Sequence, residues 1–303
     1  MELRDIEYFA VIAQHKSIGR AAEALDMSQP ALSKSLRRLE KAIRAKVVQR
    51  TSTGIELTAI GHALLAKVSR LRLTMDDISR EAADLSEGRA GHLSIGTPPA
   101  FAPHIVPMAC ETLLKEAPLV TLKLTVSERV PLLAGVRNGT LDIVLALMEI
   151  TSTEDLVEQY LYDEEYVVYA SVNHRLAKQK QVSLADLVQE RWAMSDINNP
   201  SWLRLNEVFA KASLPSPKIG LQAPYMALRQ RLVSASDLLS HGSREIVRCG
   251  AAHFPIVALN VKNFSTRRKV GVLYRNEAYL PPVGLRFIEI LKATAKKISN
   301  EAR

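Results

Sequence analysis

The sequence predicts an α/β protein with a small helical head, one long helix and a larger domain in which strands and helices alternate. Three observations support this division. Three short helical patterns and a hairpin fill the first 58 residues, and the run from Thr58 to about Glu87 has no proline and a single glycine, Gly61. After Gly91, short β-rich runs alternate with helical stretches. A chain of 303 residues is long enough for two or three such folding units.

Two helices are expected at the start of the head. The first is largely apolar and ends near His15. Ser17 is placed to cap a second helix over 18–25, because its hydroxyl can accept a hydrogen bond from an N–H group of the first turn. Alanines in this second helix allow another helix to approach closely.

A third helix is expected to begin at Ser28. Ser28 is the predicted N-cap, and Pro30 falls in the first turn, where a missing N–H group costs nothing. Apolar residues recur at spacings of four, three and four, which predicts a buried stripe. The stripe consists of Leu32, Leu36, Leu39 and Ile43.

The opposite face of this helix is polar and basic. A helix fits the major groove of DNA, and its N-terminal residues reach furthest into it. Gln29 and Ser33 are therefore the candidates for base edges, and the basic residues that follow are candidates for phosphates or guanines. Over 16–50 nine basic residues oppose three acidic ones, so much of the chain's net charge of +8 lies here. A single basic helix would more often be only a solvated surface.

A β-hairpin over 46–57, with its turn at 52–54, is expected after the third helix. A helix–turn–helix followed by a hairpin, called the wing, forms a winged helix–turn–helix. This combination favours DNA binding over a helix that is merely a solvated surface. The wing would lie near the DNA backbone or the adjacent minor groove. The predicted DNA-binding residues are Ser28, Gln29, Pro30, Ser33, Lys34, Arg37, Arg38, Arg50 and Thr51.

The first 60 residues resemble the LysR-type transcriptional regulators. The resemblance rests on the run Ala21–Ser33 and continues through Leu36, Leu39-Glu40, Val47-Val48, Arg50 and 57–61. It implies a cytoplasmic protein that binds promoter DNA and contacts RNA polymerase. It also implies a linker helix that pairs two subunits, commonly within a tetramer, and a two-lobed α/β effector-binding domain similar to periplasmic binding proteins.

The long helix carries an apolar heptad pattern of its own. Its apolar residues repeat at alternating spacings of four and three, which is typical of a helix that pairs with another. We expect this helix to pair two chains, because one DNA-binding reading head (residues 1–58) would engage only a single half-site of the operator. The alternative is that the helix packs on the C-terminal domain of its own chain. The predicted dimerisation residues are Leu64, Val68, Leu71, Met75, Ile78 and Leu85, with Ala82 in the same pattern.

The expected domains are therefore 1–58, 59–90 and 91–303. Strands are predicted over 92–96, 121–126, 141–147 and 165–172, and helices over roughly 103–116 and 130–138. By resemblance, lobe one would hold 92–164 and 268–303, and lobe two 165–267.

A small-molecule effector is expected between the lobes. Ligands of open α/β sheets bind beyond the carboxyl ends of strands and at helix N-termini, which suit a carboxylate or sulfonate. Aromatic rings could stack on a ligand ring. The predicted effector-binding residues are Thr97, Pro98, Pro99, Ala100, Phe101, Ser127, Glu128, Ala146, Ser195, Asn198 and Trp202, with Leu147 and Met148 at the same strand end.

Other function classes have little support. No common catalytic or metal-binding motif occurs, so we expect no enzyme activity, cofactor or metal. No stretch is apolar for about 18 residues, which argues against a membrane span. Two alternatives stay open: a thiol-based redox regulator using Cys110 and Cys249, and a non-specific architectural DNA-binding protein.

Overall fold

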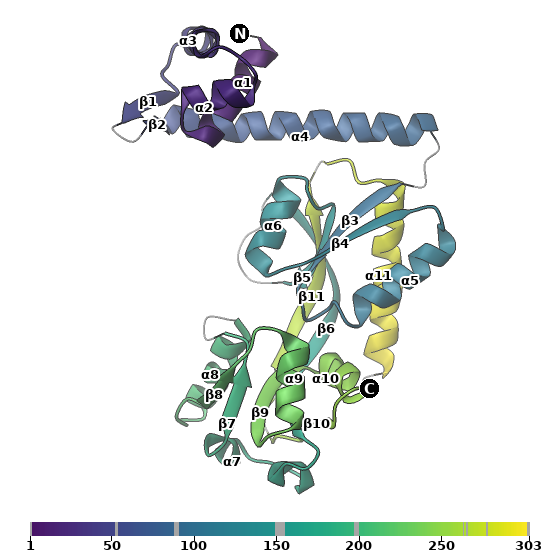
Figure 1. Ribbon diagram of the computed structural model, residues 1–303. Helices are drawn as coiled ribbons and strands as arrows, with labels where there is room; N and C mark the ends of the chain where they lie inside the picture. The colour runs from purple at the N-terminus through teal and green to yellow at the C-terminus, as the bar shows by residue number, and fades with distance from the viewer. Residues whose placement is uncertain are drawn as a thin grey trace. The chain divides into compact units, whose positions relative to one another are not determined.

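The computed structural model describes residues 2–51, 54–87, 91–148, 155–196, 200–262, 264, 266–276 and 278–301. It contains two compact units, Met1–Ala83 and Asp84–Arg303 (Figure 1). Each unit is described by itself.

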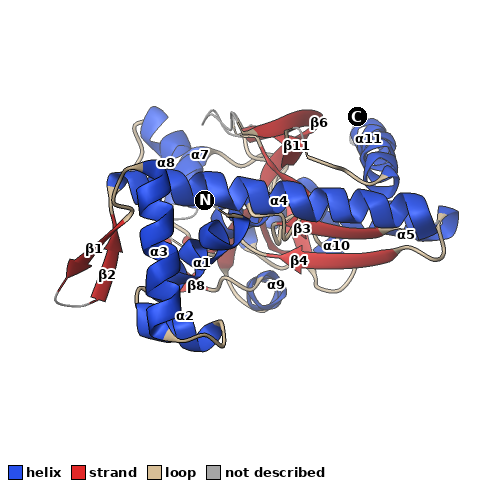
Figure 2. Ribbon diagram, turned by 90° about the horizontal axis from the view of Figure 1, so that it is seen from above, coloured by secondary structure: helices blue, strands red, loops and turns tan. Residues whose placement is uncertain are grey.

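The first unit has three short helices, a hairpin and most of a long helix (Figure 2). Ser17 caps α2 by accepting a hydrogen bond from the Arg20 amide, and Ser28 caps α3 by accepting one from the Ala31 amide. Both predicted caps are thus confirmed. The elements are α1 (Leu3–His15), α2 (Ile18–Ala24), α3 (Gln29–Ile43), β1 (Val48–Thr51), β2 (Gly54–Leu57) and α4 (Ala59–Glu87).

One apolar core joins these elements. Leu32 and Leu39 of the predicted stripe are fully buried and pack with Phe9 of α1. Leu64 and Val68 of α4 pack into the same core, so the first turns of the long helix belong to the reading head. For this reason the compact unit extends past residue 58, where we expected a domain boundary.

The start of α4 lies unusually close to the hairpin. The Thr58 hydroxyl donates to the Lys46 carbonyl at 2.7 Å and accepts from the Gly61 amide at 3.0 Å. A Cβ atom on Gly61 would lie 2.0 Å from the Val47 carbonyl oxygen. Glycine is therefore required here by space, and this contact ties the wing to the long helix.

The second unit is an α/β domain with one mixed sheet and two lobes (Figure 1). Its first lobe contains β3 (His92–Thr97), α5 (Ile105–Glu116), β4 (Thr121–Val126), α6 (Arg129–Arg137), β5 (Ile143–Leu147) and α11 (Pro282–Glu301). Its second lobe contains η1 (Arg175–Lys178), α7 (Leu184–Val188), β7 (Arg191–Met194), α8 (Pro200–Lys211), β8 (Lys218–Gln222), α9 (Met226–Ser234), β9 (Leu238–Ser243), α10 (Arg244–Ala251) and β10 (Ile256–Ala258).

Two long strands, β6 (Leu156–Ser171) and β11 (Thr266–Arg275), run through both lobes. Within the described residues the strand order is β4-β3-β5-β11-β6-β9-β7-β8, with β10 paired to β6. β3 is parallel to β4 and β5, and β7 is parallel to β8 and β9, as crossover helices require. β6 and β11 are antiparallel over their whole paired length.

The predicted start of β6 was wrong. We expected a strand only from Glu165, but β6 begins at Leu156. The stretch before Glu165 is rich in polar and acidic residues and does not form an apolar run. Its pairing with β11 holds it extended. Glu164 pairs with Arg268 in this ladder, so the two positions where we expected the chain to pass between lobes face each other.

No described helix is long and apolar enough to cross a membrane.

We predict that Gly61→Ala lowers the urea midpoint of the full-length protein. A methyl group at this position overlaps the Val47 carbonyl, and overpacking of this kind costs about 1–3 kcal/mol. Gly19→Ala is the matched control, because the nearest atom to its Cβ would be 3.9 Å away. Alanine should stabilise α2 by about 0.5–1 kcal/mol, because there is room for its methyl group. Equal midpoints for the two variants, measured by circular dichroism, would show that the close approach does not matter.

Candidate nucleic-acid interface and ligand pocket

The polar face of α3 is the candidate nucleic-acid surface. Gln29, Lys34 and Arg37 are exposed on it, and Ser33 is half-buried. Ser28, Pro30 and Arg38 are also exposed. Thr51 lies at the end of β1; the side chain of Arg50, in the same strand, lies outside the described residues. The helix thus presents its predicted contact residues away from the apolar core.

Arg38 has a second role that sequence reasoning missed. Its Nε donates to both carboxylate oxygens of Asp5, at 2.8 and 3.0 Å, and the Ser35 hydroxyl donates to the same carboxylate at 2.6 Å. Asp5 is fully buried, and the hydrogen bond from Arg38 holds its pKa well below the usual range. Arg38 therefore ties α3 to α1 and positions the recognition helix, in addition to any contact with DNA.

Glu40 fixes the wing in a similar way. Its buried carboxylate accepts hydrogen bonds from the Lys46 ammonium at 2.7 Å and from the Val47 amide at 3.1 Å. Both donors lie at the start of the hairpin. An acidic residue within a basic helix is thus explained by its contacts with the wing.

The apolar residues of the predicted heptad pattern in α4 fall into two groups. Leu64 and Val68 pack inside the first unit, whereas Leu71, Met75 and Ile78 are 41, 43 and 60% exposed. Ala82 is exposed as well, and the side chain of Leu85 lies outside the described residues. Leu71 and Met75 also line a groove of about 330 Å³ between α4 and α1.

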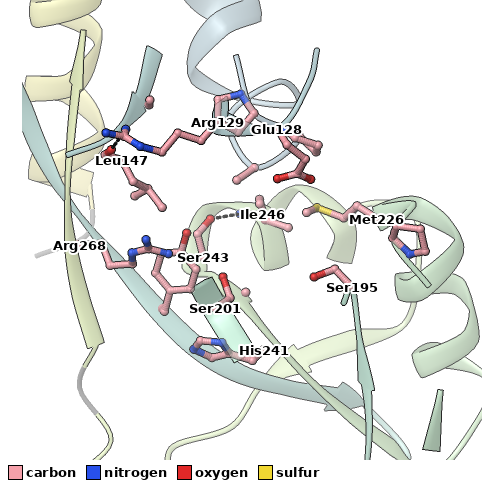
Figure 3. Close-up of a pocket in the computed structure, with 17 residues that line it drawn as sticks. Glu128, Arg129, Leu147, Ser195, Ser201, Met226, His241, Ser243, Ile246 and Arg268 are labelled. Carbon is pink, nitrogen blue, oxygen red and sulfur yellow. Dashed lines mark hydrogen bonds between the residues drawn. The ribbon is translucent and has the colours of Figure 1, made fainter. Parts of the chain in front are cut away.

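A cavity of about 130 Å³ lies between the two lobes of the second unit (Figure 3). Tyr166 of β6 and Arg268 of β11 contribute to its wall from the two long strands. The first lobe contributes Pro98, Pro99, Ala100, Glu128, Arg129, Ala146 and Leu147. The second lobe contributes Ser195, Ser201, Pro224, Met226, His241, Gly242, Ser243 and Ile246.

Four helix N-termini meet at this cavity. Arg129 is the first residue of α6 and Met226 the first of α9, while Ser201 stands in the first turn of α8. Ser243 caps α10 by accepting a hydrogen bond from the Ile246 amide at 3.2 Å. Each N-terminus carries partial positive charge and unsatisfied N–H groups. The cavity is therefore suited to an anion that touches both lobes.

Two arginines add full positive charge. The Arg129 guanidinium donates to the Leu147 carbonyl at 2.7 Å, which holds it at the edge of the first lobe. The Arg268 guanidinium lies 5.6 Å from the centre of the Tyr166 ring, in cation–π geometry. Glu128 supplies the opposing charge but is exposed to solvent.

His241 lies at the floor of the cavity (Figure 3). Its ring packs beside those of Tyr166 and Phe264, at centroid distances of 5.3 and 5.6 Å. Burial, followed by the charges of Arg268 and Arg229, lowers its pKa to about 3, so the imidazole is neutral at physiological pH. Neither ring nitrogen has a hydrogen-bond partner among the described residues. A buried polar group without a partner is unusual and often marks a functional site.

The structure brings only part of the predicted effector set to the cavity. Those that line it are Pro98, Pro99, Ala100, Glu128, Ala146 and Ser195, together with Leu147. Thr97, Ser127 and Met148 are not among its lining residues, and Asn198 lies outside the described residues.

The two aromatic rings expected on the ligand are in the cores instead. Phe101 is fully buried in the core of the first lobe, and Trp202 packs in that of the second. A large ring gains more from complete burial than from lining a small cavity, and the strand-end rule does not distinguish the two cases.

Sequence reasoning missed more than half of the lining. The residues missed are Arg129, Tyr166, Ser201, Pro224, Met226, His241, Gly242, Ser243, Ile246 and Arg268. Ser243 and Arg129 could have been found, because they follow strand ends at helix starts. Tyr166 and Arg268 lie within strands, where no local pattern distinguishes them. In the described part of the chain, no cluster of three histidine, cysteine or acidic side chains could hold a metal ion.

Comparison with protein families agrees with this architecture. Residues 3–62 match the bacterial regulatory helix-turn-helix protein, lysR family, and residues 86–296 match the LysR substrate binding domain. The chain belongs to the LysR family. It is a LysR-type transcriptional regulator with a DNA-binding helix–turn–helix and an effector-binding domain, and this family consists of transcriptional regulators rather than enzymes.

Several curated relatives are similar to this LysR-type chain. The hydrogen peroxide-inducible genes activator of Pectobacterium carotovorum is 28% identical over 194 residues, or 64% of this chain and 64% of that protein. The regulator OxyR of Escherichia coli is 30% identical over 195 residues, covering 64% and 63%. The chain thus spans less than two thirds of the length of these two relatives. The activator CmpR of Synechocystis is 26% identical over 305 residues, covering 98% of this chain and 97% of that protein.

Solved structures support the fold. CbnR complexed with its target DNA matches with a TM-score of 0.65 at 21% identity, covering 97% of this chain and 100% of that one. A full-length OxyR variant from Pseudomonas aeruginosa matches with a TM-score of 0.63 at 20% identity, covering 98% and 95%.

We predict that Arg38→Ala and Arg37→Ala differ in their effect on stability. Arg38→Ala leaves the buried Asp5 carboxylate without its main partner, so it should lower the urea midpoint of unfolding and weaken DNA binding as well. Arg37→Ala should weaken binding to all sequences and reduce the salt slope by about one, without changing stability. Urea denaturation and titrations of DNA at several salt concentrations measure the two effects. Unchanged stability for Arg38→Ala would refute its positioning role.

Proposed function

We propose that this regulator binds promoter DNA through α3 and the wing, under the control of a small organic anion held between the lobes. The observation that carries the proposal is the meeting of four helix N-termini, from α6, α8, α9 and α10, at one cavity with Arg129 and Arg268. A carboxylate or sulfonate there accepts hydrogen bonds from both lobes. Its binding therefore favours the arrangement in which the lobes are correctly placed for both sets of contacts.

Paired reading heads complete the proposed mechanism. Leu71, Met75 and Ile78 leave an apolar row exposed on α4, and an exposed row of this kind on a long helix favours pairing with a second copy. Two heads can then engage two half-sites of a palindromic operator. The effector would change the angle between the paired heads, and with it DNA bending and contact with RNA polymerase. Assembly into a tetramer belongs to the same proposal.

A thermal-shift screen of small aromatic and aliphatic acids identifies the anion. An acid present at a hundredfold excess over its dissociation constant should stabilise the protein by about 2.7 kcal/mol. The same acid should alter the DNase footprint on the operator and the promoter output. Stabilisation with an unchanged footprint and output would contradict the coupling between cavity and DNA.

We predict that Arg129→Met weakens binding of that acid about tenfold or more, because it removes a charged donor at the cavity. Arg137→Met is the matched control: it lies at the far end of the same helix and pairs with Asp155 at 2.6 Å. Calorimetry measures both affinities. If the two variants bind the acid equally well, Arg129 has no role in anion binding.

A thiol-based redox function is less well supported, although several relatives are named for induction by hydrogen peroxide. Burial raises the pKa of the Cys110 thiol to about 11, and it also raises that of Cys249. Few reactive thiolates are then present at neutral pH. The two cysteines lie in helices of different lobes, α5 and α10.

We therefore predict that the Cys110→Ser/Cys249→Ser double variant binds its operator like the wild type. Brief treatment with hydrogen peroxide should leave the operator affinity of both proteins unchanged in mobility-shift assays. A peroxide-dependent change in the wild type that is absent from the double variant would establish the redox alternative. An architectural role would instead appear as equal affinity for the operator and for random DNA.

A further inference from the structure

A second and larger cavity adjoins the effector cavity. Its volume is about 480 Å³, and it opens between the loop that precedes α5 in the first lobe and helices α9 and α10 of the second. Four residues line both cavities: Pro99, Pro224, Met226 and Ile246. The two cavities are thus neighbouring chambers, separated by a wall of apolar side chains from both lobes.

The two chambers differ in chemistry. The first contains the arginines and the helix N-termini described above. The second is lined largely by apolar groups, including Val126, Tyr225 and Phe254. Val126 is 54% and Tyr225 71% exposed, so large apolar side chains face solvent at its mouth. Covering such a surface is favourable in proportion to the apolar area removed from water.

The wall between the chambers can yield. Met226 extends across the first cavity toward Ile246 (Figure 3). Methionine has three rotatable bonds and no branch point, and it adapts readily to the shape of a ligand. A ligand whose hydrocarbon tail passes Met226 can therefore occupy both the polar chamber and the apolar one.

Size gives a second reason to consider the chambers together. The first chamber, at about 130 Å³, is close to the roughly 150 Å³ of an engineered cavity that holds benzene. It holds an acid group and a few carbon atoms and no more. Any longer ligand must continue elsewhere, and the adjoining apolar chamber lies directly beyond the shared wall.

We infer that the effector is an amphipathic acid, with its anionic group in the first chamber and an apolar tail in the second. This inference rests on the proposed function, because it takes the first chamber as the anion site. It adds the class of ligand: a monoacid with a hydrocarbon or aryl tail, rather than a short or highly polar acid.

The test is calorimetric titration of the full-length protein with acetate, butyrate, hexanoate, octanoate and decanoate. Affinity should rise with chain length, by up to about fourfold for each added methylene group, because each buried methylene contributes about 0.8 kcal/mol. The increase should cease once the second chamber is filled.

Variants locate the tail. Ala227→Trp and Ala102→Trp place a large ring in the second chamber from opposite lobes, and each should abolish the gain with chain length while short acids bind as before. Leu228→Trp is the matched control, since Leu228 is the next residue of α9, is 48% exposed and is not among the lining residues of either cavity. It should keep the wild-type dependence on chain length.

The outcomes separate the two hypotheses. Acids that bind with no dependence on chain length overturn the amphipathic ligand and leave the proposed function intact. A dependence that both tryptophan variants retain also overturns it, because the tail then binds elsewhere. If no acid of this series binds, this inference fails; if the screen of aromatic and aliphatic acids finds none either, the proposed function fails with it. Sedimentation velocity, measured with each acid, reports whether a second copy of the chain covers the mouth of the second chamber instead. That result would also contradict the inference.

Discussion

The antiparallel ladder between β6 and β11 is the constraint on which the ligand-binding unit depends. It runs from the pair Tyr166–Thr266 to the pair Leu156–Arg275, past both lobes. β5 joins it from the first lobe and β9 from the second. Because one two-stranded ribbon carries both half-sheets, the lobes can move relative to each other only by bending it. The cavity lies beside this ribbon and receives Tyr166 and Arg268 from it.

This arrangement gives the cavity its electrostatic character. The strands of the two half-sheets run so that helices from both lobes begin at the cavity. The partial positive charge of one helix N-terminus is weak, but here several act on one ligand. The ring nitrogens of the neutral His241 have no hydrogen-bond partner among the described residues. Burying them in this way costs free energy of folding, which a purely structural core would avoid. In the other unit, Asp5 and Glu40 are buried carboxylates whose partners fix the positions of α3 and the wing. The first unit thus uses buried charge to position the elements of its candidate DNA-binding surface.

Local signals in the sequence predicted local structure well. Ser17 and Ser28 were identified as caps because capping depends on a few neighbouring residues, and the strand over 121–126 was found from its β-rich composition. Contacts between distant residues were not predictable in this way. Arg38 pairs with Asp5, 33 positions away, and Phe101 and Trp202 went to the cores because packing partners elsewhere in the chain decide their burial. For the same reason, lining residues within the long strands, such as Tyr166 and Arg268, were not predicted.

The central claim is that one anion is held by both lobes at once. Hydrogen exchange of the full-length protein, with and without an acid that binds, tests it most directly. We predict slower exchange at the N-terminal amides of α6 in the first lobe and of α8, α9 and α10 in the second, together with the β6–β11 ribbon between them. Protection confined to one lobe, with the other lobe and the ribbon unchanged, would contradict it.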